Sequence, residues 1–300
     1  MFSFTPKAKA SAMPIPKPDA TRHALLAEMS GRPVALVVFE ATGGYERALR
    51  QTLANEDVPH ACVQPTRVRH FIEAHGHAAK TDRLDAQALA RFGAAGLAMP
   101  SARQSADLLA LRDLMRTLAF IRKQMATLKC QMEKIGGQGG GPQCLAALLE
   151  TGKTQEQVLL ETIAAHVASS DRLKTLVDLL VSMPGIGLYT ATTVVAELPE
   201  LGTCSKAEIA ALVGIAPFTR DSGKRKGQAA IRGGRHYARK ALYMAAITAM
   251  RFNPVFKTLY QELRNRGKCF KVAIVAVMRK MAIALNAMAK NNQPWNLYRA

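Results

Sequence analysis

The sequence predicts an α/β N-terminal domain, a long helical arm and an all-α C-terminal domain. Residues 29–104 alternate between β-prone and helical segments, which is typical of a layered α/β fold. Residues 105–135 carry apolar side chains at helical spacing for about eight turns, and the last third repeats this spacing in shorter stretches. We therefore expect four parts, at 1–28 (irregular tail and short helix), 29–104, 105–180 and 181–300.

The N-terminal part opens with a segment rich in Pro and Lys, which predicts a tail up to about Asp19. A short helix, TRHALLAEMSG, follows and ends at a Gly. PVALVVFE is a continuous β-prone run, the pattern of a strand buried on both faces, and HACVQP is a second short strand. Helices are expected at ATGGYERALRQTLANE, TRVRHFIEAHG and KTDRLDAQALARFGAAGLA. This order predicts a parallel or mixed sheet covered by helices.

The middle of the chain predicts a pair of long helices. The stretch 105–135 ends in the glycine-rich break GGQGGGPQ, and a second helical stretch over roughly 154–182 is long enough to run back along the first. A long amphipathic helix packs against a partner helix, in the same chain or in another. The pair is therefore either a coiled-coil arm that joins two domains or a dimerisation arm, and the sequence does not choose between them.

The last third begins with the tight turn MPGIG at the start of a helix. Helix N-termini favour phosphate, so Gly185 and Gly187 are candidates for backbone contacts to nucleic acid. The competing interpretation is a simple connection, since Pro-Gly turns also join helices. Further helices are expected at about 205–213, 235–251 and 269–290.

The net charge of +19 is uneven along the chain. Residues 1–100 hold 12 basic and 9 acidic residues, residues 101–180 hold 10 and 8, and residues 181–300 hold 19 and 5. A basic excess confined to one segment points to a polyanion, above all nucleic acid, as the partner of that segment. A generally basic but inert surface would spread the charge more evenly.

Several classes of protein are disfavoured. No uninterrupted apolar run reaches about 18 residues, so a membrane span is not expected. The N-terminus carries Pro and Lys where a signal peptide would need an apolar stretch. The five cysteines are scattered without a CxxC pair, a pattern that suits a reducing cytosol and offers neither a disulfide framework nor a zinc site.

The most unusual stretch is 219–240, TRDSGKRKGQAAIRGGRHYARK, in which Ser222 lies among eight cations. One interpretation is a solvated turn, where Ser and Gly are ordinary residues. The other is a nucleophile that attacks a phosphodiester, with the cations holding the DNA backbone. His236 is the nearest histidine, so a local Ser-His pair is unsupported by the spacing. The candidate nucleic-acid contacts are Lys224, Arg225, Lys226, Arg232, Arg235 and Arg239.

Three acids are candidates for a Mg²⁺ (or Mn²⁺) site. Glu40 ends the apolar strand run, at the edge where α/β folds place their ligands, and a charge there is costly without a partner or a role. Asp82 and Asp85 are three residues apart on one helix face. Carboxylates suit Mg²⁺ in phosphodiester chemistry. The alternative is that both aspartates are ordinary helix-start acids, which the helix dipole favours by itself.

Four motifs in order resemble the DEDD transposases of the insertion-sequence family IS110: VVFEATGGYE, AKTDRLDAQALARF, SMPGIG with TATTVVAELPELG, and ALVGIAPFTRDSGKRKGQAAIRGGRHYARKALYMAA. The resemblance implies a ribonuclease-H-like N-terminal domain, a coiled-coil arm and a helical C-terminal domain with a nucleophilic serine. By motif, Glu40, Asp82 and Asp85 match three of the four metal-binding acids, and Ser222 matches the serine. It also implies strand exchange on insertion-sequence and target DNA, guided by a bridge RNA, by a dimer or tetramer at the bacterial nucleoid in the cytoplasm.

The sequence departs from the family pattern at its start. The family's first Asp lies on an opening strand, and the residues before Glu40 hold no such strand; Asp19 lies in a Pro-flanked loop and is not a match. Two functions therefore stay open: a metal- and serine-dependent transposase whose true start lies upstream, or a truncated, impaired copy that only binds DNA and RNA. Tyr45 and Tyr243 are alternative nucleophiles by residue type, but their helical surroundings favour packing or groove roles.

Overall fold

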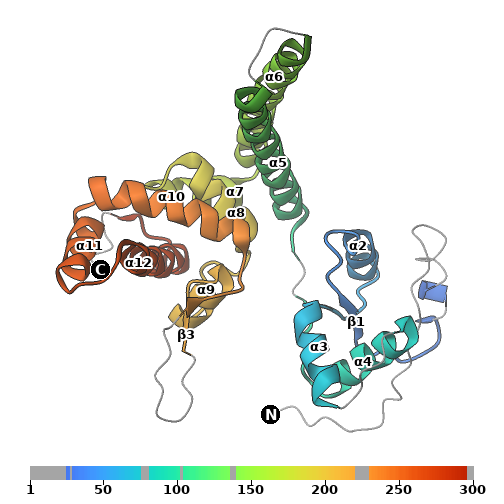
Figure 1. Cartoon of the computed structure of the whole chain (residues 1–300). Helices are drawn as coiled ribbons and strands as arrows, with labels where there is room; N and C mark the ends of the chain where they lie inside the picture. Colours follow the sequence, from blue (N-terminus) through green and yellow to red (C-terminus); the bar gives the residue numbers. More distant parts are fainter. Residues whose placement is uncertain are drawn as a thin grey trace. The chain divides into compact units, whose positions relative to one another are not determined.

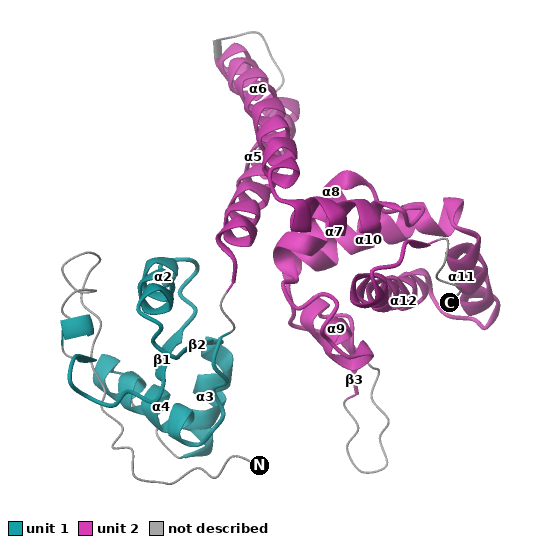
Figure 2. Cartoon of the chain, turned by 180° about the vertical axis from the view of Figure 1, so that it is seen from behind, with its two compact units in different colours: residues 1–103 teal, residues 104–300 magenta. Residues whose placement is uncertain are grey.

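The computed structural model describes residues 25–27, 29–75, 81–101, 104–135, 140–219 and 230–295 (Figure 1). The chain divides into two compact units, Met1–Arg103 and Gln104–Ala300 (Figure 2). Each unit has its own hydrophobic core. The arm and the C-terminal region, which the sequence analysis separates, lie together in unit 2.

Unit 1 is built around a small β-α-β motif. Its elements are β1 (Val37–Glu40), α2 (Arg47–Asn55), β2 (His60–Val63), α3 (Pro65–Ala74) and α4 (Asp82–Ala94). The two strands pair in parallel, from Val37 opposite His60 to Glu40 opposite Val63. A parallel pair needs a crossover connection, which α2 supplies. The predicted strand–helix order of this unit is therefore observed, with shorter strands than the apolar runs suggested.

Helices cover both faces of the two-stranded sheet. Because side chains alternate along a strand, Phe39 faces α2, where it packs with Leu49 and Leu53. Val38 faces the opposite side and meets α4 so closely that a Cβ added to Gly93 would lie 2.8 Å from a Val38 methyl carbon. Glu40 is two residues beyond Val38, so it projects on the face that α4 covers.

The described residues of unit 2 are helical apart from one short antiparallel pair of strands. Its elements are α5 (Ala106–Ile135), α6 (Gly140–Ala168), α7 (Asp171–Val181), α8 (Leu188–Glu197), α9 (Lys206–Val213), β3 (Pro217–Phe218), β4 (Ala230–Ile231), α10 (His236–Phe252), α11 (Pro254–Asn265) and α12 (Phe270–Asn291). α6 runs back along α5 (Figure 1).

Three sequence predictions in this unit were wrong. The glycine-rich break is shorter than expected, because helix α6 already begins at Gly140. The stretch 154–182 is not one helix: α6 ends at Ala168 and α7 begins at Asp171, after Ser170. Helix α11 was missed, although Asn253 caps its start by accepting a hydrogen bond from the Val255 N–H, and Pro254 follows at the first helical position.

One continuous core runs from the base of the arm through the C-terminal helices. It extends from Leu108 and Leu111 on α5 to Met288 on α12. α12 is long and apolar enough to cross a membrane, judged by its length and composition alone. Ten of its residues are nevertheless buried, and eight of these belong to this core. Its apolar character is that of a core helix.

Candidate catalytic acids and nucleic-acid interface

The structure places the three candidate acids at two points of unit 1. Asp82 and Asp85 lie in the first turn of α4, where the Thr81 hydroxyl accepts a hydrogen bond from the Leu84 N–H at 3.3 Å. Asp82 is exposed, whereas Asp85 is half-buried beside a small cavity of about 70 Å³ between α3 and α4. Glu40 ends β1 and is half-buried.

These acids do not fit a metal site as the structure arranges them. Within the described ranges, no three His, Cys, Asp or Glu side chains come close enough to hold one ion. α4 touches β1 at Gly93, eight residues after Asp85, so Asp85 lies about 12 Å from that contact along the helix axis. Glu40 is only two strand residues from that contact. The predicted Mg²⁺ cluster is therefore not assembled by these three residues.

Sequence reasoning missed Glu46, which shapes the turn after β1. Its carboxylate accepts hydrogen bonds from the N–H groups of Thr42 and Gly44, at 3.0 and 2.8 Å, and from the Thr42 hydroxyl at 3.2 Å. Partial burial raises the pKa of Glu46, but these hydrogen bonds outweigh it and leave the pKa below its ordinary value. The carboxylate thus fixes the glycine-rich turn that follows Glu40.

In unit 2 the paired strands β3 and β4 flank residues 219–229, which include Ser222 and which we call the serine segment. Phe218 pairs with Ala230, and Pro217 with Ile231, so residues 219 and 229 adjoin paired strands. Ser222, Lys224, Arg225 and Lys226 lie outside the described residues, and their predicted roles stay predictions. Arg232 is exposed, and the Cζ atom of its guanidinium lies 4.7 Å from the centroid of the Phe218 ring.

Arg235 and Arg239 anchor this segment to the rest of the unit. The Arg235 guanidinium donates two hydrogen bonds to Glu200, at 2.5 and 2.6 Å, and its backbone N–H donates to the Leu212 carbonyl at 2.7 Å. The Arg239 guanidinium donates to the backbone carbonyls of Gly214 and Gly233. Both side chains are therefore committed within the protein, a role that differs from the phosphate contacts expected of them.

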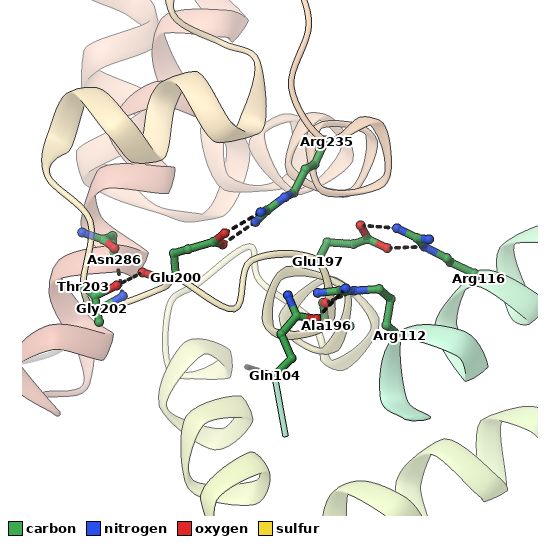
Figure 3. A network of polar contacts seen from close by, with 10 residues as sticks. All are labelled: Gln104, Arg112, Arg116, Ala196, Glu197, Glu200, Gly202, Thr203, Arg235 and Asn286. Atoms are coloured by element: carbon green, nitrogen blue, oxygen red, sulfur yellow. Dashed lines mark hydrogen bonds and ion pairs between the residues drawn. The ribbon is translucent and has the colours of Figure 1, made fainter. Parts of the chain in front are cut away.

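A polar network links the same region to the arm (Figure 3). Arg116 on α5 donates to both carboxylate oxygens of Glu197, at 2.8 and 3.1 Å, and Glu197 is only 3% exposed. Hydrogen bonding to Glu197 raises the pKa of Arg116. One turn earlier, Arg112 donates to the Ala196 carbonyl at 2.8 Å. The base of α5 is thereby fixed to the end of α8, three residues before Glu200.

The described carboxylates of the last third form ion pairs or hydrogen bonds within the protein, so the remaining surface charge of this region is positive. Glu197 pairs with Arg116 and Glu200 with Arg235, while Glu208 forms a capping box with Ser205 at the start of α9. Glu262 pairs with Arg266 at 3.9 Å, and Asp221 lies outside the described residues. The described carboxylates of residues 181–300 therefore act mainly on internal partners, and the outward charge of this region is positive.

The two glycines of the PGIG turn have different roles. Gly185 has φ +102°, and a Cβ there would lie 2.6 Å from the Ala249 Cβ on α10, so this position requires glycine for packing. Gly187 caps the start of α8 with φ −88° and has open space around it. The connecting role is thus evident at Gly185, and the phosphate-binding role stays a prediction for Gly187.

Gly185→Ala is expected to destabilise unit 2 by about 2–4 kcal/mol, because it adds a strained backbone and a clash with Ala249. Gly187→Ala is the matched control. Because Ala is less favourable than Gly at the N-cap position of a helix, this variant should lower the free energy of unfolding by only about 0.5–1 kcal/mol. Thermal unfolding of both variants measures the difference. A stable Gly185→Ala protein with weakened nucleic-acid binding would instead support the phosphate role for Gly185.

Glu200→Gln is expected to lower the melting temperature of unit 2 by about 2–4 °C, the effect of about 1 kcal/mol. Burial raises the pKa of Glu200, but the hydrogen bonds and charge of Arg235, together with the charge of Arg112, lower it on balance. Because the pKa of Glu200 is lower in the folded state, its carboxylate stabilises the fold at pH values above the unfolded-state pKa near 4.5. This stabilisation is lost as the pH falls through the lower folded-state pKa. The difference between wild type and variant should be full at pH 6 and shrink below pH 4.5; a constant difference contradicts the ion pair.

A β-α-β unit with acids near its strand end, followed by a helical unit that carries a basic segment, is compatible with the DNA transposase and recombinase class, and similarity to known proteins identifies that class. The profile of the Transposase IS116/IS110/IS902 family matches residues 177–261, and that of the DEDD transposase domain of IS110 elements matches residues 6–135. The chain belongs to the IS110 family of transposases. The second match implies a ribonuclease-H-like fold for unit 1, and it begins inside the segment predicted to be a tail.

Three relatives illustrate the similarity. The chain is 30% identical over 150 residues to the Insertion element IS110 uncharacterized 43.6 kDa protein of Streptomyces coelicolor. This aligned region covers 49% of the chain and 35% of the relative. It is 23% identical over 273 residues to the Pilin gene-inverting protein of Moraxella lacunata, covering 87% and 81%. It is 26% identical over 214 residues to the Insertion element IS900 uncharacterized 42 kDa protein of Mycobacterium paratuberculosis, covering 66% and 53%. The match thus spans about a third of the Streptomyces protein and about half of the mycobacterial one.

Proposed function

We propose that this chain cuts and rejoins insertion-sequence DNA, with Ser222 as the nucleophile. The observation that carries the proposal is the base of the serine segment: β3 and β4 pair on either side of it, and Arg235 fastens it to Glu200. A segment with fixed ends and an excess of cations is suited to present a hydroxyl to a phosphodiester. The Moraxella relative, a pilin gene-inverting protein, supports DNA recombination as the class of reaction.

In the proposed step the Ser222 Oγ attacks phosphorus, and an O–P bond to the protein forms as one ester P–O bond of the DNA breaks. The serine proton leaves with the departing hydroxyl, so charge is conserved. The nearby cations, including Arg232, offset the charge of the phosphoryl group during the transfer. Rejoining is the same exchange in reverse, with a DNA hydroxyl displacing the serine.

The wider partners are also proposals. The family resemblance suggests insertion-sequence and target DNA, a bridge RNA as guide, and a dimer or tetramer as the working assembly. Divalent metal, Mg²⁺ or Mn²⁺, belongs to the proposal through the family's acids, since Glu40, Asp82 and Asp85 do not form a metal cluster in the described part of the chain.

A second function, nucleic-acid binding without cutting, is favoured by the arrangement of the three candidate acids. The helical unit with its basic excess keeps an intact core, whereas Glu40, Asp82 and Asp85 form no metal-binding group within the residues that the structure describes. Such a chain would still hold DNA and RNA through unit 2. Both functions predict nucleic-acid binding, and only the first predicts a covalent intermediate.

Covalent capture separates the two. Purified protein is incubated with labelled element-end DNA and element-derived RNA, in Mg²⁺ or in EDTA, then denatured and resolved by size. A labelled protein–DNA adduct that requires Mg²⁺ supports the transposase. Retained binding without any adduct supports the binding-only function, and loss of both overturns the proposal.

A further inference from the structure

Helix α10 has an outward face that its packing does not explain. Its buried residues are mostly alanines, including Ala238, Ala245 and Ala249, and they pack on α8 and α12. The opposite face carries larger side chains, all exposed: Tyr237, Lys240, Tyr243, Met244 and Arg251. Exposed aromatic and apolar side chains gathered on one face mark an interaction surface.

These side chains form one strip. Tyr237, Met244 and Arg251 are spaced by seven residues, so each lies nearly above the last, with a drift of about 20° per step. Lys240 lies beside this line, three residues after Tyr237 and four before Met244, and Tyr243 lies three residues after Lys240, on the flank of the strip. From Tyr237 to Arg251 the strip is about 21 Å long. We call these five residues the α10 strip.

The charge of the strip is uniformly positive. No Asp or Glu occurs in α10, whose sequence is HYARKALYMAAITAMRF. Within the described residues, neither Lys240 nor Arg251 forms an ion pair. A strip with available cations and no acids is complementary to a polyanion.

The two tyrosines differ in how they are held. The Tyr237 ring lies under the Arg116 guanidinium at 5.6 Å and meets the His236 ring edge-on at 5.7 Å, so neighbours fix its orientation. Tyr243 is 36% exposed and has no ring or cation contact among the described residues. Tyr243 therefore presents an aromatic face to an outside partner, one turn from Lys240 on the flank of the strip.

We propose that the α10 strip binds unpaired nucleotides, with a base stacked on Tyr243 and phosphates held by Lys240 and Arg251. This inference rests on the proposed function and narrows its ligand to single-stranded nucleic acid. Aromatic side chains stack on the faces of unpaired bases, whereas a duplex hides those faces. α10 also begins directly after Arg235, so the strip continues the basic segment.

A second copy of the chain fits the strip less well. A symmetric contact would bring Lys240 and Arg251 against the same residues of the partner, and like charges at an interface disfavour it. Charge complementarity thus selects a nucleic acid over a self-contact.

The test uses full-length protein and fluorescence anisotropy with three labelled probes of one sequence: single-stranded DNA, single-stranded RNA and duplex DNA. Tyr243→Ala should weaken binding of both single strands by about tenfold, the usual effect of losing one stacked base, and of duplex by less than about twofold. Tyr243→Phe should keep the affinity. Phe120→Ala, at an exposed aromatic of α5 (59% exposed), is the matched control and should change nothing.

Lys240→Ala gives an independent readout. It should reduce the salt dependence of single-strand binding by about 0.7 in the log–log slope, as expected for one lost phosphate contact, whereas Tyr243→Ala should leave the slope unchanged. Lys123→Ala on α5 is its control. A response of only one of the two single strands would show that the sugar, not stacking, dominates, and would overturn the inference.

The inference is overturned if Tyr243→Ala has no effect, if it weakens duplex and single strands equally, or if light scattering shows that it changes the oligomeric state. Circular dichroism checks that each variant is folded, and the salt dependence of Lys240→Ala keeps the inference testable if Tyr243→Ala does not fold. Because the Ser222 adduct is assayed separately, an adduct with an inert strip would refute this inference and leave the proposed function standing.

Discussion

Ser222→Ala is expected to abolish the covalent protein–DNA adduct and to lower strand exchange by about a thousandfold or more, because the hydroxyl is the only group that can form the proposed ester. Nucleic-acid affinity should stay within about twofold, since the surrounding cations are unchanged. Denaturing gels measure the adduct, and anisotropy measures the affinity.

Thr219→Ala is the matched control for this experiment. Thr219 is exposed, carries a hydroxyl and lies next to β3 at the start of the same segment. It should retain the adduct. Should Ser222→Ala still form an adduct, the nucleophile is another residue, and mapping of the linked peptide would identify it.

Arg116→Met is expected to destabilise unit 2 by about 3 kcal/mol, because it leaves the carboxylate of Glu197 buried without its partner. For a unit of this size the melting temperature should fall by roughly 6–12 °C. The Glu197 side chain is 4% exposed and that of Arg116 is 37% exposed, so the cost lies mainly on the carboxylate side. Thermal unfolding followed by circular dichroism measures it.

The double variant Arg116→Met/Glu197→Met separates pairing from packing. Replacing both partners removes the unpaired charge, so most of the lost stability should return. Arg266→Met, which breaks the exposed pair with Glu262, is the control and should cost less than about 0.5 kcal/mol. Equal losses in the single and double variants would show that the arginine stem, not the ion pair, supplies the stability.

Much of the fold could be predicted from local sequence signals. The apolar run before Glu40 predicted β1, and the spacing of apolar residues predicted α5, α9, α10 and α12. Helix α11 carried a readable signal as well, an Asn followed by Pro at its start, but that signal was overlooked. The division between α6 and α7 was likewise marked by the serines before Asp171.

The site was less predictable, because its key contacts join residues far apart in the chain. The sequence predicts that Arg235 contacts phosphate, whereas in the structure its guanidinium donates hydrogen bonds to Glu200, 35 residues earlier in the chain. Gly185 looked like part of a phosphate-binding turn, whereas its contact with Ala249 makes it a packing residue. Residue type and spacing identify a basic segment, but only the tertiary structure separates its anchors from the cations left for a ligand.

The buried pair of Arg116 and Glu197 has a mechanical consequence for the arm. α5 continues for 19 residues beyond Arg116, to Ile135, so the helix extends about 28 Å from its fastening point. With the base held rigidly to α8, α5 acts as a lever: a rotation of about 10° of the C-terminal helices would carry its tip through about 5 Å. A partner bound at the tip would therefore be displaced by several ångströms when the helices near the serine segment rotate slightly. Conversely, a displacement of the tip by that partner would rotate these helices.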